Sequence, residues 1–519
     1  MDDGTVSLLV LGLTVVVFVW NRLPVDVVAL LAALALWATG LLGFTEVVAG
    51  FGDPVVIFIA ALFVVSEGID STGVTAWVGQ AIVRYAGTTR SRLLIAVTSL
   101  CAVLSALITL NGAVAALLPL VVMLAVRIGQ PPSRMLMPLS FAGSAGALLM
   151  LTGTPVNIIV SDASADAGEG PFAFFSFALV GVPLVAGTIA ISVLLGPRLL
   201  PSARPAHPAV DFARHAETLE LHYALGGTEE LMSRDSGVVE AVVPPRSSLI
   251  GETVYSGMQR GADLVIVAVQ RMGKDRGGKP TQLAEGDALL VRGPWSALDE
   301  LTRDRDILLV DSPELIRRQA VPWGRRASIA VTILGAMVVL LATGAVPPAL
   351  AGLLAALAMV LTRVVRPAQA YRAISWQIVV LIGALIPLSA AIRTSGGADR
   401  IADLIIDAIG PGRPYLLLLA LFVLTTVLGQ VVSNTATVLI VTPIAVAAAH
   451  GTGTSVRPVL MLIAVAGAAS LLTPISTPAN MMIMSPAGYR FGDYWKLGLP
   501  VLGWWLLTAM IVIPLVWSF

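Results

Sequence analysis

Residues 147–157 read Ala-Leu-Leu-Met-Leu-Thr-Gly-Thr-Pro-Val-Asn, and residues 470–480 read Ser-Leu-Leu-Thr-Pro-Ile-Ser-Thr-Pro-Ala-Asn. Proline removes a backbone donor and disfavours helix at the residue before it, so each stretch predicts a break in an otherwise apolar helix. Thr477 follows Thr154 by the same number of positions as Asn434 follows Asn111, and we call this separation the repeat offset. It also relates Gly396 to Gly73 and Pro347 to Pro24. One offset that fits distant motifs predicts two homologous halves.

The composition around these breaks is that of a membrane protein. The 519 residues are 57% hydrophobic and 12% charged, and the mean hydropathy is +0.89. Apolar runs of about 16 to 20 residues are long enough to cross a hydrocarbon layer of roughly 30 Å as helices. The runs fall near 5–20, 25–42, 54–68, 91–108, 111–128, 135–160, 172–197, 327–344, 348–364, 376–392, 414–431, 435–450, 457–486 and 497–518. We expect an all-α polytopic bundle.

A polar segment separates the two sets of apolar runs. Residues 201–323 hold most of the charged side chains, and short alternating stretches such as 263–269 and 288–291 predict strands. We therefore divide the chain into a first transmembrane repeat at 1–200, a small α/β insert at 201–323 and a second transmembrane repeat at 324–519.

The basic residues of the short loops predict the orientation of the chain. Arginines such as Arg22, Arg90 and Arg134 gather on one side, whereas the opposing loop 161–171 carries acids alone. The positive-inside rule then places both termini outside the inner membrane and the insert in the cytoplasm. The number of membrane crossings agrees with this orientation only if 91–128 and 414–450 turn back as re-entrant hairpins. The two halves are then inverted repeats.

Inverted repeats with broken helices are typical of secondary transporters whose site lies near the membrane midplane. Carbonyl groups freed at a break can ligate a cation, and the N-terminus of a half-helix can face an anion. Each hairpin also has a polar tip, Thr109 to Ala113 in the first and Ser433 to Thr437 in the second. Amide and hydroxyl groups supply donors and acceptors without the cost of burying a charge. Proline kinks and helix-to-helix contacts between amides and hydroxyls are the structural alternatives.

At these residues the chain resembles the divalent anion/sodium symporter family of the ion transporter superfamily, over nearly all of 1–200 and 324–519. In that family a Ser-Asn-Thr motif at each hairpin tip forms, with the facing broken helix, a Na⁺ site and half of a substrate site. The second tip, Ser433-Asn434-Thr435, reproduces the motif, whereas Leu110 and Gly112 replace its flanking residues around Asn111. The resemblance further implies elevator-type alternating access and a homodimer.

The resemblance assigns two overlapping sets of residues. The substrate set is Asn111, Gly112, Thr154, Pro155, Asn157, Ser433, Asn434, Thr435, Thr477, Pro478 and Asn480. The Na⁺ set is Asn111, Thr152, Gly153, Ser433, Asn434, Thr473 and Ser476. No cofactor other than the coupling ion is implied.

The insert resembles the C-terminal ligand-sensing module of TrkA-type potassium-uptake regulators over about 237–310. Arg246 to Glu252, Asp263 to Arg271 and the Gly-Asp of 286–287 carry this resemblance. It implies a small regulatory ligand on the insert.

Together these features predict a non-enzymatic carrier of small anions, coupled to Na⁺, that is embedded in membrane lipid. The missing hydroxyls at the first tip favour a sulfate-like oxyanion over a dicarboxylate. An arsenite or metalloid extruder of the same superfamily, a ligand-gated anion channel and a sensor without transport are the alternatives. The sequence has no phosphate-binding Gly-rich loop that ends in Lys-Ser/Thr, so we do not expect ATP-driven pumping. A net charge of zero gives no reason to expect a nucleic-acid partner. The lone Cys101 excludes an internal disulfide.

Overall fold

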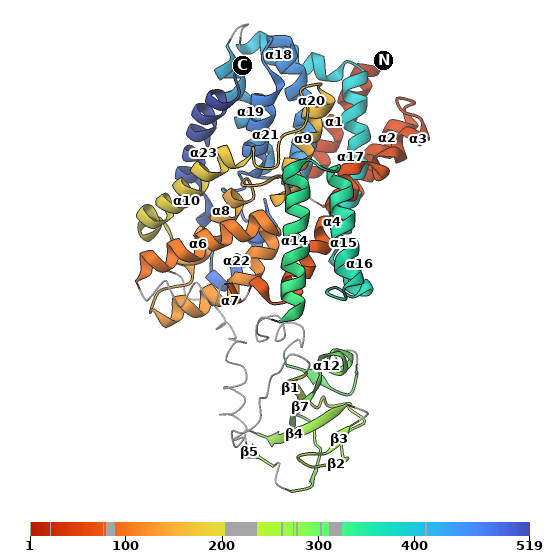
Figure 1. Cartoon of the computed structure of the whole chain (residues 1–519), viewed down its shortest axis with the longest axis vertical. Helices are drawn as coiled ribbons and strands as arrows, with labels where there is room; N and C mark the ends of the chain where they lie inside the picture. The colour runs from red at the N-terminus through yellow and green to blue at the C-terminus, as the bar shows by residue number, and fades with distance from the viewer. Residues whose placement is uncertain are drawn as a thin grey trace. The chain divides into compact units, whose positions relative to one another are not determined.

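A computed structural model describes residues 2–20, 22–75, 77–78, 89–202, 236–260, 263–272, 274–276, 279–301, 304–310, 324–409 and 413–519 (Figure 1). The chain forms two compact units. The helical unit covers 1–69, 79–209 and 329–519, and the insert unit covers 70–78 and 210–328. In Figure 1 both chain ends lie at the top of the helical unit.

The described helices of the chain up to Leu200 include the first break, between α8 and α9. They are α1 (Asp3–Trp20), α2 (Val25–Ala38), α3 (Phe44–Ala49), η1 (Gly50–Gly52), α4 (Pro54–Ser71), α6 (Arg90–Leu107), α7 (Leu110–Arg127), α8 (Ser133–Gly146), η2 (Leu151–Gly153), α9 (Pro155–Asp166) and α10 (Ala178–Leu199).

The described helices after the insert follow the same order. They are α14 (Arg325–Thr343), α15 (Pro348–Leu361), α16 (Pro367–Ala373), α17 (Trp376–Thr394), α18 (Gly397–Ile409), α19 (Pro414–Gly429), α20 (Asn434–Thr452), α21 (Val456–Ala468), α22 (Pro478–Ala487), η4 (Phe491–Asp493) and α23 (Tyr494–Val516).

The repeat offset recurs in the positions of these helices. The helices α15, α21 and α22 follow α2, α8 and α9, respectively, by that offset without deviation at their first residues. For α17, α19 and α20 the separation from α4, α6 and α7 agrees with it to within one residue, whereas α23 begins seven residues earlier than the offset from α10 requires.

Eight described helical segments are long and apolar enough to cross a membrane. The predicted spans at 25–42 and 348–364 are shorter than expected, because α2 and α15 have 14 residues each. At 1.5 Å per residue such a helix covers about 21 Å, less than the hydrocarbon layer. The sequence interpretation also missed α18, whose apolar residues lie on one face between polar ones and form no continuous apolar run.

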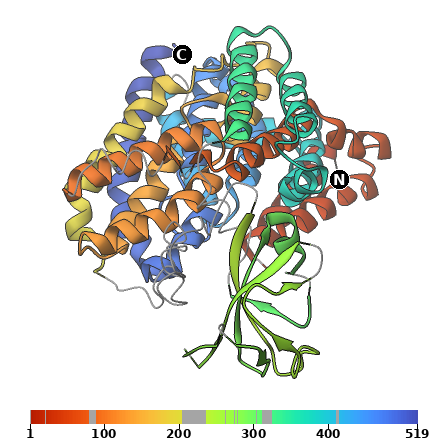
Figure 2. The same ribbon diagram turned by 60° about the horizontal axis from the view of Figure 1, so that its bottom comes forward.

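Packing brings helices of the two sets together. The helix α2 packs on α17, α10 lies along α23, and α9 packs on both α20 and α21 (Figures 1 and 2). Close approach at the first break requires glycine, since a Cβ on Gly153 would lie 2.2 Å from the carbonyl oxygen of Ala147.

The insert unit has its own sheet and core. Strands β3 (Gln259–Arg260), β4 (Leu264–Arg271), β7 (Ala288–Pro294), β1 (Ser236–Val242) and β8 (Leu308–Leu309) pair in that order, with β5 (Lys274–Asp275) on β4. All of these pairings are antiparallel. The strands β2 (Thr253–Val254) and β6 (Thr281–Gln282) form a second small sheet, and α12 (Trp295–Leu301) packs on β1 and β7. Both predicted strands are confirmed.

One ion pair crosses the edge of this core. The Arg271 guanidinium donates from Nε and Nη2 to the two carboxylate oxygens of Asp287, each at 2.7 Å, and the Asp287 side chain is fully buried. Desolvation raises the pKa of Asp287, but hydrogen bonds from Arg271 and from the backbone of Ala284 outweigh it, so the pKa lies below its ordinary value.

Candidate substrate site

The two helix breaks are built in the same way. Thr154 and Thr477 are extended N-cap residues, with φ of −154° and −142°, and each side chain accepts a hydrogen bond from the first turn of the following helix. Pro155 and Pro478 then open α9 and α22 at the one helical position where a missing N–H costs nothing. Each break therefore ends with a capped helix N-terminus.

An asparagine side chain stabilises each break by donating to backbone carbonyl groups that precede it in the sequence. Asn157 Nδ2 donates to the carbonyl oxygens of Ala147, at 2.9 Å, and Met150, at 2.8 Å. Asn480 Nδ2 donates to the equivalent carbonyls of Ser470, at 2.8 Å, and Thr473, at 3.1 Å. Both side chains satisfy backbone groups that the break removes from the helix ladder.

The second hairpin tip is linked to its break by further polar contacts. Gln430, which follows α19, donates from Nε2 to the Ala469 carbonyl at 3.0 Å and accepts from the Leu472 amide at 2.9 Å. The Ser470 hydroxyl donates to Asn434 Oδ1. A buried amide within the apolar run 414–431 is the signal that would have identified Gln430.

The tips and the breaks line one cavity of about 410 Å³. Its wall includes most of the predicted site residues, namely Asn111, Thr152, Gly153, Thr154, Pro155, Ser433, Asn434, Thr435, Ser476, Thr477 and Pro478. Four predicted residues are not part of this wall, namely Gly112, Asn157, Thr473 and Asn480. The two asparagines are fully buried and support the breaks instead of facing the cavity.

Residues of α4 and α17 also line the cavity. Ile59 and Phe63 come from α4, and Ser375 and Gln377 come from the start of α17. Sequence reasoning missed them because nothing in an apolar run such as 54–68 shows which face meets a distant tip.

The electrostatics of the cavity come from helix ends and neutral polar groups. No Asp, Glu, Lys, Arg or His is among its lining residues, which belong to the described part of the chain. The N-terminal residues of α7, α9, α20 and α22 all lie on the wall. Each helix N-terminus carries about half a positive charge and exposes unpaired N–H groups, so four converging ends favour an anion.

The asparagine side chains of the two tips differ in their hydrogen bonds. Asn434 Oδ1 accepts from Ser470, whereas Asn111 Oδ1 is buried and makes no hydrogen bond in the described structure. Ala147, the counterpart of Ser470 under the repeat offset, offers no hydroxyl. The first tip therefore presents an acceptor that a ligand could fill.

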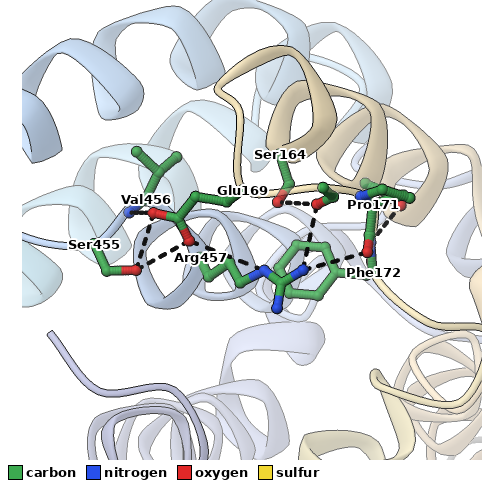
Figure 3. A network of polar contacts seen from close by, with 9 residues as sticks. Ser164, Glu169, Pro171, Phe172, Ser455, Val456 and Arg457 are labelled. Atoms are coloured by element: carbon green, nitrogen blue, oxygen red, sulfur yellow. Dashed lines mark hydrogen bonds and ion pairs between the residues drawn. The ribbon is translucent and has the colours of Figure 1, made fainter.

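A second polar network ties α9 to α21 (Figure 3). The Glu169 carboxylate accepts from the Val456 amide at 2.9 Å and from the Ser455 hydroxyl at 3.1 Å, so it caps the N-terminus of α21. Arg457 lies 3.9 Å from the same carboxylate and 5.8 Å from the centre of the Phe172 ring. The segment after α9 is thus joined to the start of α21, at the ends of these two helices that lie away from the breaks.

Broken helices whose N-termini surround a neutral polar cavity, within a bundle of apolar helices, define a polytopic membrane transporter. The family model described as citrate transporter matches residues 15–453 and 388–519. The chain therefore belongs to the citrate transporter family, and it is a transporter and not an enzyme.

Individual relatives agree with this assignment. The chain is 29% identical to an uncharacterized transporter, YfbS, of Escherichia coli, with 98% of each chain covered. It is 27% identical to a probable sodium/sulfate cotransporter 3 of Chlamydomonas reinhardtii, over 53% of this chain and 32% of that protein. In fold it is similar to the crystal structure of the YdaH transporter of Alcanivorax borkumensis, with a TM-score of 0.53, 16% identity, and 97% and 98% of the two chains covered.

Proposed function

We propose that the protein carries a small divalent anion, with sulfate favoured over dicarboxylates, across the inner membrane together with Na⁺. The observation that carries this proposal is the convergence of four helix N-termini on one cavity without an ionisable side chain. A dianion placed there meets partial positive charge and donor groups on every side. Relatives described as sodium/sulfate cotransporters support both the anion and the cation.

The cation is proposed to bind beside the second tip. Asn434, Ser476 and Thr435 bring neutral oxygen atoms to the wall there, and hard cations prefer oxygen ligands. The first tip supplies Asn111, with Leu110 where the second tip has Ser433, and the first break supplies the Thr152 hydroxyl. We therefore assign one complete cation site to the second tip and an anion contact to the Nδ2 amide group of Asn111.

Alternating access is proposed to arise from two inverted repeats. The recurrence of helix bounds at the repeat offset supports the repeats, and the cavity wall supports the mechanism. On that wall the tips and breaks face α4 and α17. In an elevator mechanism the tips and breaks slide along α4 and α17 and carry the substrate site with them. We also propose that the protein is a homodimer within the lipid bilayer and that both of its termini lie outside.

The experiment that tests this function is uptake by the purified protein in liposomes. Labelled sulfate, succinate and citrate are offered with and without an inward Na⁺ gradient. We expect saturable sulfate uptake that depends on the gradient and is inhibited weakly by succinate. Tight succinate binding without inhibition by sulfate would exclude the oxyanion, and currents too large for a carrier would indicate a channel.

The insert is proposed to be a cytosolic regulatory module of the TrkA C-terminal kind. It has its own buried core around Val239, Ile266 and Trp295, and none of its described residues lines the cavity. Replacing 215–312 with a short flexible linker is expected to change the rate or its regulation while substrate binding persists. Loss of binding with folded transmembrane helices would show that the insert takes part in the site.

A further inference from the structure

A second cavity of the helical unit has the opposite character. It measures about 300 Å³, and it is lined by side chains from the α4 start, α9, α17, α18 and α20. Four carboxylates, those of Asp53, Asp162, Asp166 and Asp399, share it with one guanidinium, that of Arg393. Arg393 lies 3.6 Å from Asp166 and thereby compensates one of the four. With a neutral His450 on its wall, this acidic cavity carries a formal charge of −3.

A buried hydroxyl in the acidic cavity has no protein partner. Thr442, in the middle of α20, is 5% exposed, lines the cavity, and its Oγ1 makes no hydrogen bond in the described structure. A threonine within a helix can usually bond the carbonyl one turn earlier, so a buried hydroxyl without any partner needs an explanation. One explanation is that the Thr442 hydroxyl oxygen is a ligand for a cation. The four carboxylates of the cavity support this explanation, because they attract cations.

The acidic cavity lies along the same helices as the substrate cavity. On α17 the residues that line the substrate cavity lie between Ser375 and Leu381, and those that line the acidic cavity lie between Ile382 and Arg393. On α9 the change occurs between Pro155 and Ile159, and Asp162 lies about 10 Å beyond Pro155 at 1.5 Å per residue. A cation held near Asp162 is therefore within a few helix turns of the substrate site.

We propose that the acidic cavity collects small monovalent cations and that a cation enters through it before the anion does. Within the described residues no three His, Cys, Asp or Glu side chains are arranged to chelate a metal, so the cavity attracts cations by charge and not by chelation. A cleft lined by one sign of charge concentrates counter-ions and repels ions of its own sign. A dianion meets less repulsion once a cation has neutralised part of the wall. The order of entry rests on the proposed function, whereas cation collection does not.

The charge of Asp162 depends on pH. Desolvation by the surrounding protein and the nearby Asp53 and Asp166 carboxylates raise the pKa of Asp162 to about 6, and Arg393 opposes them. Asp399 of α18 and His450 of α20 face the same cavity. Because the neutral carboxyl attracts no cation, collection is expected to be full at pH 7.5 and to weaken as the pH falls through about 6.

The test measures cation binding and uptake with the same variants of the full chain. Asp162→Asn and Thr442→Val remove the two groups, and Asp403→Asn on α18 is the matched control, since Asp403 is exposed and lies off the cavity. The thermal midpoint is followed in NaCl against N-methylglucamine chloride at equal ionic strength and at pH 7.5. We expect the Na⁺-dependent rise to shrink at least twofold in both variants and to stay unchanged in the control.

Uptake of labelled sulfate then reports the order of entry. In Asp162→Asn the external Na⁺ concentration for half-maximal uptake is expected to rise about threefold to tenfold at low ionic strength, with little change in maximal rate. Equal Na⁺-dependent thermal shifts in Asp162→Asn, Asp403→Asn and the unmodified protein would overturn the cation site. A shift that depends on Asp162 without Na⁺-dependent uptake would retain the site and reject the proposed coupling and the order of entry.

Discussion

The two halves of the substrate site share one backbone plan but differ in their side chains. At the second tip, Asn434 is flanked by Ser433 and Thr435 and accepts from Ser470. At the first tip, Asn111 is flanked by Leu110 and Gly112, and its oxygen has no partner in the described structure. The difference teaches that the breaks preserve architecture, whereas the tips determine what each half can bind.

The largest effect is expected at the satisfied tip. Asn434→Ala removes an amide from the cavity wall and leaves Ser470 without its acceptor. Hydrogen bonds to charged groups are worth about 1.5–3 kcal/mol each, so kcat/KM for uptake should fall about 100-fold or more. Asn111→Ala should lose about tenfold, because its oxygen has no protein partner to lose. Equal losses in reconstituted uptake would show that the two tips contribute alike.

A smaller effect is expected when the first tip is made more like the second. Leu110 lies on the cavity wall, whereas Gly112 does not, so Leu110→Ser is the informative change. One added hydroxyl should improve succinate competition relative to sulfate by about tenfold. Leu110→Ala is the matched control, since it removes the same side chain without adding a donor. The same improvement in both variants would attribute the change to space and not to hydrogen bonding.

A third experiment makes the second break resemble the first. The Ser140 hydroxyl donates to Asn480 Oδ1 at 2.7 Å, whereas Asn157 Oδ1 is buried without a partner in the described structure. Ser140→Ala should lower the free energy of unfolding by about 1–3 kcal/mol, because it leaves a buried acceptor unsatisfied. Ser192→Ala, at a buried serine whose oxygen has no hydrogen bond among the described residues, should cost clearly less. Thermal unfolding in detergent separates the two, and equal losses would refute this account.

The smallest effect on transport is expected in the insert. Arg271→Met leaves the buried Asp287 carboxylate without its guanidinium, so the free energy of insert unfolding should fall. The lowered pKa of Asp287 means that its contribution is present above pH 3.8 and is lost as the pH falls through the lower folded value. Hydrogen exchange in β4 and β7 of the full chain measures this. Unchanged hydrogen exchange at pH 7 would show that the ion pair does not contribute to the stability of the insert.

Much of the helical plan could be predicted from the sequence. Prolines at 155 and 478 mark the breaks, and apolar runs mark most helices, because both effects are local. The direction of a side chain on a short half-helix is not local. Asn157 and Asn480 follow the Thr-Pro pairs and were assigned to substrate, yet they point back to carbonyls seven and ten residues earlier. Ser375 and Gln377 reach the wall only through tertiary packing.

The contact between Ser140 and Asn480 also bears on how the protein is made. Asn157 binds carbonyls within ten residues of itself, so its clamp can form while the ribosome is still near that segment. The acceptor oxygen of Asn480 is satisfied by a hydroxyl translated 340 residues earlier. If the gene were divided at the insert, each product would contain the carbonyl groups that its own asparagine clamps, but the Asn480 oxygen of the C-terminal product would lack Ser140 until the N-terminal product was inserted beside it. The second break is therefore completed only when the half synthesised first is already in place.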